Sequence, residues 1–144
     1  MRLTYLKYLN GTKDEGLVFR SDGKWKVYMS VDASFNHHYD AKGHSGLVVF
    51  AAEGSAGILF KSLKQKTVAN SSCEAELIAL HEGVQYLIWI LSVYHELGYD
   101  MNETVKIGQD NKATIMISSQ NPVNFSNIFP FTKRIFVLLE TVLS

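Results

Sequence analysis

The sequence has little of several features that would narrow its function. Its 144 residues include one cysteine, Cys73, so no disulfide can form within the chain, which is compatible with a reducing compartment. Lysine plus arginine equals aspartate plus glutamate, at 14 each, and the net charge is zero. The overall charge therefore gives no argument for a nucleic-acid partner, and only a local basic patch would supply one.

The sequence also lacks long hydrophobic segments. The longest apolar run, Tyr86–Leu91, is far shorter than the ~20 residues that span a bilayer. The N-terminus has neither the apolar core nor the cleavage site of a signal peptide. These absences predict an intracellular protein, cytoplasmic or nuclear, with no membrane partner. Hydrophobic residues make up 47% of the chain and charged residues 19%, which indicates one globular domain.

Alternating and continuous apolar segments predict a sheet. Four strands are expected, at Lys24–Asp32, Gly46–Ala52, Ala56–Ser62 and Thr104–Gln109, with a candidate edge strand at Gly16–Arg20. In the first strand, Val27, Met29 and Val31 share one face, and Asp32 ends the other, more polar face. A short Gly-containing turn separates the second and third strands, so the first three form an antiparallel meander.

Apolar residues at intervals of three and four predict the helices. They are expected at Met1–Asn10, Cys73–Leu97, Lys112–Ser118 and Thr132–Leu143. Gly98 is the expected stop of the longest helix. Because this helix lies between the meander and the fourth strand, a right-handed crossover would make the fourth strand parallel to the first. The fold class is therefore α/β, with a mixed sheet flanked by helices.

The start of the long helix carries two acids with different expected roles. Ser71 and Glu74 have the spacing of a capping box, in which each side chain satisfies a backbone N–H of the other residue. Glu76 has no such structural explanation. It lies at the border of the apolar stripe, so it either reaches solvent or faces a group that needs negative charge.

Two further acids are expected near Glu76. Asp32 ends the first strand and Asp110 follows the fourth, so parallel pairing would bring both to one edge of the sheet. A cluster of carboxylates favours hard cations such as Mg²⁺. Two such ions can activate water and stabilise a leaving phosphodiester oxygen. The other interpretation is that both aspartates are ordinary turn residues.

Two basic clusters lie in loops. Lys61, Lys64 and Lys66 fit either a solvated cluster or phosphate contacts beside the helix N-terminus, and their spacing does not decide between the two. His37, His38 and His44 match no common zinc spacing, and no cysteine assists them. Their pattern favours solvated loop histidines over zinc ligands.

Several segments resemble the ribonuclease H domain of Pol polyproteins from copia-type LTR retrotransposons. They are VDAS (Val31–Ser34), KSLKQKTVANSSCEAELIAL (Lys61–Leu80) and QDNKATI (Gln109–Ile115). YLNGTKDEGLVF (Tyr8–Phe19) resembles the segment that joins reverse transcriptase to that domain. The resemblance covers nearly the whole chain. It implies a ribonuclease H-like fold with a five-stranded mixed sheet, and Mg²⁺-dependent endonucleolytic cleavage of RNA in RNA–DNA hybrids.

The resemblance also implies roles for particular residues. The family's acids fall on Asp32, Glu76 and Asp110, which would be catalytic and would bind two Mg²⁺ ions, with Mn²⁺ as a substitute. The implied nucleic-acid contacts are Lys61, Lys64, Lys66, Ser71 and Asn111. The implied partners are the hybrid and the reverse transcriptase portion of the same polyprotein.

The chain departs from the family pattern near its C-terminus. The family's fourth carboxylate lies in an Ala-Asp-x-x-Thr-Lys segment that this sequence does not contain, and Phe136 stands where the final helix often has aspartate. We therefore expect a fragment: residues 1–20 as the tail of the connection, and residues 21–144 as a C-terminally truncated domain lacking the fifth strand. The alternatives are a catalytically dead remnant that binds nucleic acid or protein, and a related integrase core.

Overall fold

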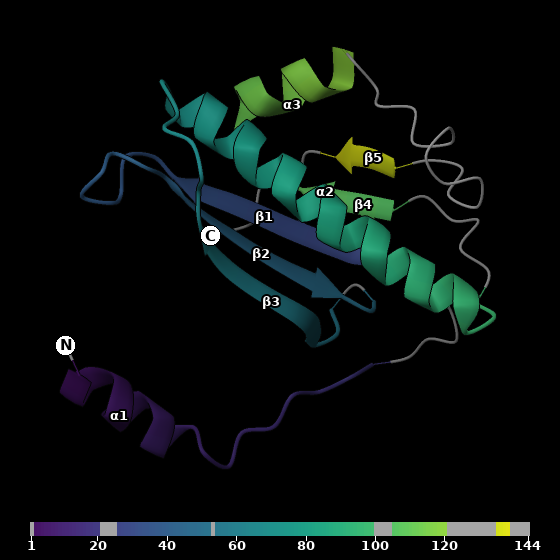
Figure 1. The fold of residues 1–144 in the computed structure, drawn as a ribbon. Helices are drawn as coiled ribbons and strands as arrows, with labels where there is room; N and C mark the ends of the chain where they lie inside the picture. The colour runs from purple at the N-terminus through teal and green to yellow at the C-terminus, as the bar shows by residue number, and fades with distance from the viewer. Residues whose placement is uncertain (1, 21–25, 53, 100–104, 121–134, 139–144) are drawn as a thin grey trace.

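The fold is a mixed sheet with one long helix packed across it (Figure 1). The computed structural model describes residues 2–20, 26–52, 54–99, 105–120 and 135–138. Its helices are α1 (Arg2–Gly11), α2 (Ser72–Glu96) and α3 (Lys112–Gln120). Its strands are β1 (Tyr28–Ser34), β2 (His44–Phe50), β3 (Gly57–Lys64), β4 (Val105–Gly108) and β5 (Ile135–Leu138).

The sheet has five strands in the order β3-β2-β1-β4-β5. The first three pair antiparallel as the predicted meander. The strand β4 pairs parallel with β1, and β5 pairs parallel with β4. The expected crossover is confirmed: the chain leaves β3, crosses the sheet through α2 and returns beside β1.

The core lies between α2 and one face of the sheet. Alternation along β1 buries Met29 and Val31, as the sequence predicts, and Ser30 and Asp32 project from the other face. Leu87 and Leu91 of α2 pack into this core. Gly83 brings the helix close to β1, because a Cβ there would lie 3.0 Å from Met29 Cε. The helix therefore packs closely on β1 at this position.

Both ends of α2 follow local rules. The helix begins after Ser71, whose side chain accepts a hydrogen bond from the backbone N–H of Glu74. It ends before Gly98, which has a φ of 85° and donates to the carbonyl of His95. By length and composition alone α2 could cross a membrane, but the core helix of a soluble protein passes the same test, and α2 packs on the sheet.

The expected absence of a fifth strand is wrong. Residues Ile135–Leu138, for which the sequence predicts part of a helix, form β5 instead. The segment IFVL is a short apolar run rich in β-branched and aromatic residues, and periodicity cannot distinguish such a run from a helix turn. Pairing with β4 decides in favour of the strand. The rest of the predicted helix, residues 132–134 and 139–143, lies outside the described residues.

The N-terminal region follows the prediction only in part. The helix α1 forms as expected and lies apart from the sheet in Figure 1, with Leu3, Leu6 and Leu9 exposed. The predicted edge strand at residues 16–20 is wrong. The segment is joined to the turn before β3 by a hydrogen bond from Ala56 N–H to Val18 O and by one from the backbone N–H of Arg20 to Ser55 Oγ, and no ladder forms among the described residues.

Candidate metal centre

The parallel register of β1 and β4 places two aspartates side by side. Ser30 of β1 is level with Gly108, the last residue of β4, so Asp32 and Asp110 each follow this level by two residues and lie at the same edge of the sheet. Both side chains are exposed at this edge of the sheet. The sequence-based expectation that parallel pairing would bring these acids to one edge is confirmed.

The first turns of α2 complete the cluster. Asp32, Glu76 and Asp110 each offer a carboxylate oxygen, and these oxygens all lie within 4.8 Å of one another. In the described part of the chain, no other group of three or more His, Cys, Asp or Glu side chains has this spacing. The exposed fraction of Glu76 is 7%, so the cluster combines one buried and two exposed carboxylates.

Gln109 holds the buried acid in place. Its Nε2 donates a 3.1 Å hydrogen bond to Glu76 Oε2, and its Oε1 accepts one of 3.1 Å from the backbone N–H of Asn111. The Gln109 side chain is 1% exposed. The backbone of Ala33 also hydrogen-bonds to the Glu76 carboxyl. These contacts tie α2 to the ends of both β1 and β4.

Burial and like charge change the acidity of Glu76. Desolvation is the largest effect, and with repulsion from Asp32 and Asp110 it raises the pKa of Glu76 from 4.5 to about 7. Hydrogen bonds from Gln109 and Ala33 oppose this rise and favour the ionised form. A cation in the cluster would remove the repulsion and stabilise all three carboxylates as anions.

Ser71 and Glu74 act mainly on the helix start. Ser71 caps α2, but Glu74 does not complete the predicted capping box. Its Oε2 instead accepts hydrogen bonds from the backbone N–H of Asn70 at 2.7 Å and from Asn70 Nδ2 at 3.0 Å. These bonds lower the pKa of Glu74 below its usual value. The two glutamates of the motif therefore have opposite environments, as the sequence suggested.

Asn111 has a structural role as the cap of α3. Its Oδ1 accepts a 3.1 Å hydrogen bond from the backbone N–H of Thr114. Thr114 is buried, and its Oγ1 donates to the carbonyl of Cys73 at 3.3 Å. The first turns of α2 and α3 are therefore joined directly behind the acids. The predicted nucleic-acid contacts at Ser71 and Asn111 remain predictions.

The three predicted contact lysines do not form one patch. Lys61 and Lys64 are three residues apart on β3, so they project to opposite faces. Lys61 Nζ lies 5.1 Å from the centroid of the Tyr86 ring on α2, whereas Lys64 Nζ lies 2.8 Å from Asp40 Oδ2. Lys66 is exposed beyond the end of β3. The lysines therefore have three separate environments.

Sequence reasoning missed two buried glutamines. Gln109 orients Glu76, and Gln65 links the loop after β3 to α2 by donating to the carbonyl of Ala75 at 2.8 Å and to Ser45 Oγ at 3.1 Å. Gln65 lies between Lys64 and Lys66, and Gln109 precedes Asp110, so both glutamines are adjacent to charged residues that the sequence predicted to be functional. The available signal for Gln109 was its position between a short buried strand and Asp110, where a polar side chain can turn toward the acids.

The chain resembles parts of larger known proteins. It is 31% identical over 124 residues, 85% of its length, to the retrovirus-related Pol polyprotein from transposon RE2 of Arabidopsis thaliana. It is 35% identical over 117 residues, 81% of its length, to the corresponding polyprotein from transposon TNT 1-94 of Nicotiana tabacum. Both of these homologues are retrovirus-related Pol polyproteins. The chain spans 8% of the length of each.

Three further findings concern the chain. It is 33% identical over 85 residues to secreted RxLR effector protein 161 of Plasmopara viticola, a match that covers 59% of each protein. No protein-family model matches it. Among solved structures it is similar to the N-terminal RNase H domain of a Mycobacterium tuberculosis protein, with a TM-score of 0.53, 17% identity, and coverage of 81% and 83% of the two chains. The fold is therefore ribonuclease H-like.

Proposed function

We propose that this chain is a retrotransposon-derived ribonuclease H domain that hydrolyses the RNA strand of RNA–DNA hybrids. The observation that carries the proposal is the meeting of Asp32, Glu76 and Asp110 within 4.8 Å on a ribonuclease H-like fold. Three side chains from separate parts of the sequence would not converge in this way as ordinary turn residues. The match to Pol polyproteins supports the same function.

The donor set fits Mg²⁺. All three side chains offer carboxylate oxygens, the ligands that this hard cation prefers, and two of them are exposed so that bound water can remain. Desolvation, together with repulsion from Asp32 and Asp110, raises the pKa of Glu76, and a bound cation would relieve that repulsion. We propose that two Mg²⁺ ions bind here, with Mn²⁺ as a substitute.

The chain's own residues would position the reaction. Asp32 and Asp110 hold the exposed side of the centre, and Glu76 holds its buried side. Gln109 keeps the Glu76 carboxylate oriented and favours its ionised form, so less of the binding free energy is lost to reorganisation. When bound, the ions would activate a water for attack on the phosphodiester and stabilise the leaving oxygen.

The proposed substrate is recognised by its backbone. Duplex shape and 2′-OH groups, rather than base edges, would distinguish a hybrid from DNA. Lys66 and the helix start at Ser71 lie on the surface that leads from β3 into α2, where phosphate contacts are proposed. The other proposed contacts already have partners within the protein, namely Tyr86 for Lys61, Asp40 for Lys64 and the Thr114 N–H for Asn111. Binding of a phosphate by these residues would compete with those interactions.

The place of the chain in a longer protein is also a proposal. Residues 1–20 would belong to the connection to reverse transcriptase, and the ribonuclease H domain would begin after them. The exposed leucines of α1 and its separation from the sheet support this division (Figure 1). The reverse transcriptase portion of the polyprotein is the proposed partner of α1, and the proposed location is intracellular.

Cleavage of a hybrid with a labelled RNA strand tests the function. The chain should cleave the hybrid in Mg²⁺ or Mn²⁺, and should leave duplex DNA of the same sequence intact. Asp32→Asn and Glu76→Gln should each abolish cleavage. Glu96→Gln is the matched control for Glu76→Gln, because Glu96 is an exposed acid at the far end of the same helix.

The outcomes separate an enzyme from a binding module. Cleavage that survives both site variants would come from a contaminant and would refute the assignment. A chain that binds the hybrid in Mg²⁺ without cleaving it would support the alternative of a non-catalytic remnant. Binding should therefore be measured in the same samples, by the anisotropy of the labelled hybrid.

A further inference from the structure

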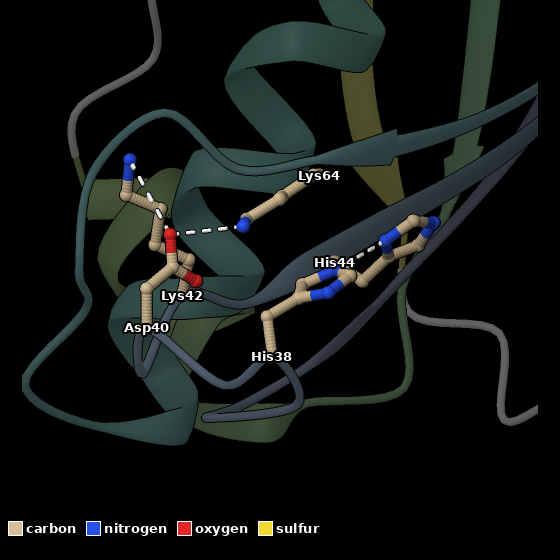
Figure 2. A network of polar contacts seen from close by, with 5 residues as sticks. All are labelled: His38, Asp40, Lys42, His44 and Lys64. Carbon is tan, nitrogen blue, oxygen red and sulfur yellow. Dashed lines mark hydrogen bonds and ion pairs between the residues drawn. The ribbon is translucent and has the colours of Figure 1, made fainter.

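Three histidines that the proposed function does not use meet at the start of β2. His37 and His38 lie in the loop after β1, and His44 begins β2. The Nε2 atom of His38 lies 2.8 Å from Nδ1 of His44 (Figure 2). The ring centroid of His37 is 5.4 Å from that of His38 and 6.3 Å from that of His44. His38 and His44 are half-buried and hydrogen-bonded to each other, a pairing that the sequence did not predict.

We propose that His38 and His44 form a second metal site, which takes a borderline divalent transition ion such as Zn²⁺. Two nitrogens bound to one ion at Zn–N distances of about 2.0–2.1 Å are separated by about 2.9–3.3 Å for bond angles between a right angle and the tetrahedral angle. The observed separation of 2.8 Å is close to this range, and an ion would replace the hydrogen bond once both rings turn so that their nitrogens point at one position beside the N–N line. Water would complete the coordination.

Ser62 orients the ring of His44 in the way that is usual for metal-binding histidines. The Nε2 atom of His44 lies 2.7 Å from Ser62 Oγ on β3, so the remaining nitrogen of the same ring faces His38. Such a bond from the outer ring nitrogen fixes the tautomer and the ring direction of a metal ligand. In cross-strand register His44 is paired with Lys64 of β3 and Ser34 of β1, so it is anchored at a central strand of the sheet.

The loop that carries His38 is held in one conformation. The backbone N–H of His38 donates to Lys42 O at 3.0 Å, and that of Ala41 donates to His38 O at 2.9 Å. Ala41 has a φ of 61°, a left-handed conformation that costs a non-glycine residue free energy and is retained only where its surroundings impose it. His38 is therefore placed against His44 before any ion arrives, which reduces the entropic cost of binding.

One carboxylate and two lysines lie beside the histidine pair. Asp40 Oδ2 lies 2.8 Å from Lys64 Nζ and 3.9 Å from Lys42 Nζ, so the carboxylate offsets part of the charge of the two lysines (Figure 2). Desolvation, followed by the charges of Lys64 and the neighbouring histidines, lowers the pKa of His38 below its usual value.

This site is distinct from the carboxylate centre. His44 is level with Ser34, two residues beyond Asp32 on β1, which corresponds to roughly 7 Å along the strand. The donor sets also differ, because imidazole nitrogen suits Zn²⁺ and carboxylate oxygen suits Mg²⁺. An ion between His38 and His44 would tie the loop after β1 to β2. It would therefore stabilise the fold without taking part in hydrolysis.

Calorimetric titration with Zn²⁺ in excess Mg²⁺ tests the proposal. The wild-type chain should bind one Zn²⁺ that His38→Gln and His44→Gln each abolish. Ser62→Ala should weaken binding by about tenfold, because it removes only the orienting bond. The exposed His81 of α2 supplies the matched control, and His81→Gln should bind Zn²⁺ as the wild type does. Glu76→Gln should also retain this ion, which separates the result from any failure of the carboxylate centre.

A second measurement covers variants that fold poorly. In the wild-type chain, substoichiometric Ni²⁺ should broaden the NMR signals of the His38 and His44 rings before those of His81 and His95. The proposal is supported if the heat of Zn²⁺ binding is lost only in His38→Gln and His44→Gln and the NMR signals broaden in this order. Equal Zn²⁺ binding by wild type and both variants, or broadening that begins at Asp32 and Asp110, would overturn it.

Discussion

Gln109 Nε2 donates a 3.1 Å hydrogen bond to Glu76 Oε2, and this contact joins the end of β4 to the first turns of α2. Both side chains are buried. Because the bond favours the ionised carboxylate, Gln109 acts on the charge of the centre without being one of its acids. The first prediction concerns this residue.

Gln109→Leu should destabilise the chain and weaken Mg²⁺ binding at pH 7. The substitution removes one hydrogen bond from the buried carboxyl of Glu76 and the partner of the Asn111 backbone N–H, which costs about 1–3 kcal/mol. It also raises the pKa of Glu76 further, so less of the carboxylate is ionised. Urea unfolding with and without Mg²⁺ measures both effects. Gln85→Leu, at an exposed position of α2, is the control. Equal behaviour of the two variants would contradict the role of Gln109.

Stability without divalent ions should fall as the pH rises. Because the pKa of Glu76 is raised from 4.5 to about 7 in the folded state, the folded chain binds more protons than the unfolded chain between these values. The contribution of Glu76 to the free energy of unfolding is fully present below pH ~4.5 and is lost as the pH rises through ~7. The loss from this group is at most on the order of 3 kcal/mol. Thermal unfolding across this range, in chelator, measures the slope.

The pH slope has a specific control. Glu76→Gln removes the titrating group, so its slope between pH 5 and 8 should be smaller than that of the wild type. Saturating Mg²⁺ should reduce the wild-type slope in the same way, because the bound ion favours the ionised carboxylate. A wild-type slope that neither change affects would mean that another group is responsible.

Ser71→Ala should act mainly on helix stability. The side chain caps α2 through the backbone N–H of Glu74, and loss of such a cap typically costs about 1 kcal/mol. Ser71→Gly should cost only a few tenths of that amount. Ser72→Ala, at the next exposed position, is the control. If hybrid affinity falls in Ser71→Gly while stability holds, the proposed nucleic-acid contact at this residue gains support.

The lysines should contribute unequally to hybrid binding. Lys66 is exposed, so Lys66→Gln should reduce the slope of log affinity against log salt by about one. Lys61 lies over the Tyr86 ring, so Lys61→Gln should change the slope less. Affinities measured by fluorescence anisotropy at several salt concentrations test this order. A larger effect of Lys61→Gln would contradict it.

The sequence predicted those parts of the fold in which local pattern and tertiary packing agree. Alternation in β1 predicted its buried face, and the position of α2 between two strands predicted the parallel pairing that brings Asp32 and Asp110 together. These predictions needed only strand periodicity and the handedness of the crossover. The convergence of Glu76 followed from its place in the first turns of the covering helix.

Other features depended on contacts that a linear pattern does not contain. The segment Ile135–Leu138 is a strand because β4 offers it an edge, although its apolar residues also fit a helix. Glu74 bonds to Asn70 because the chain before Ser71 turns toward it. The pairing of His38 with His44 requires a loop with a left-handed Ala41, which no residue preference would indicate.

The carboxyl signal of Glu76 in a ¹³C NMR titration tests the central claim most directly. The account predicts a pKa near 7 in chelator, because Asp32, Asp110 and burial oppose ionisation, and a much lower pKa in saturating Mg²⁺. Asp110→Asn should lower the pKa of Glu76 measured in chelator and should reduce the change in this pKa on adding Mg²⁺. A Glu76 pKa near 4.5 in chelator that Mg²⁺ does not change would show that the three carboxylates do not form one metal centre.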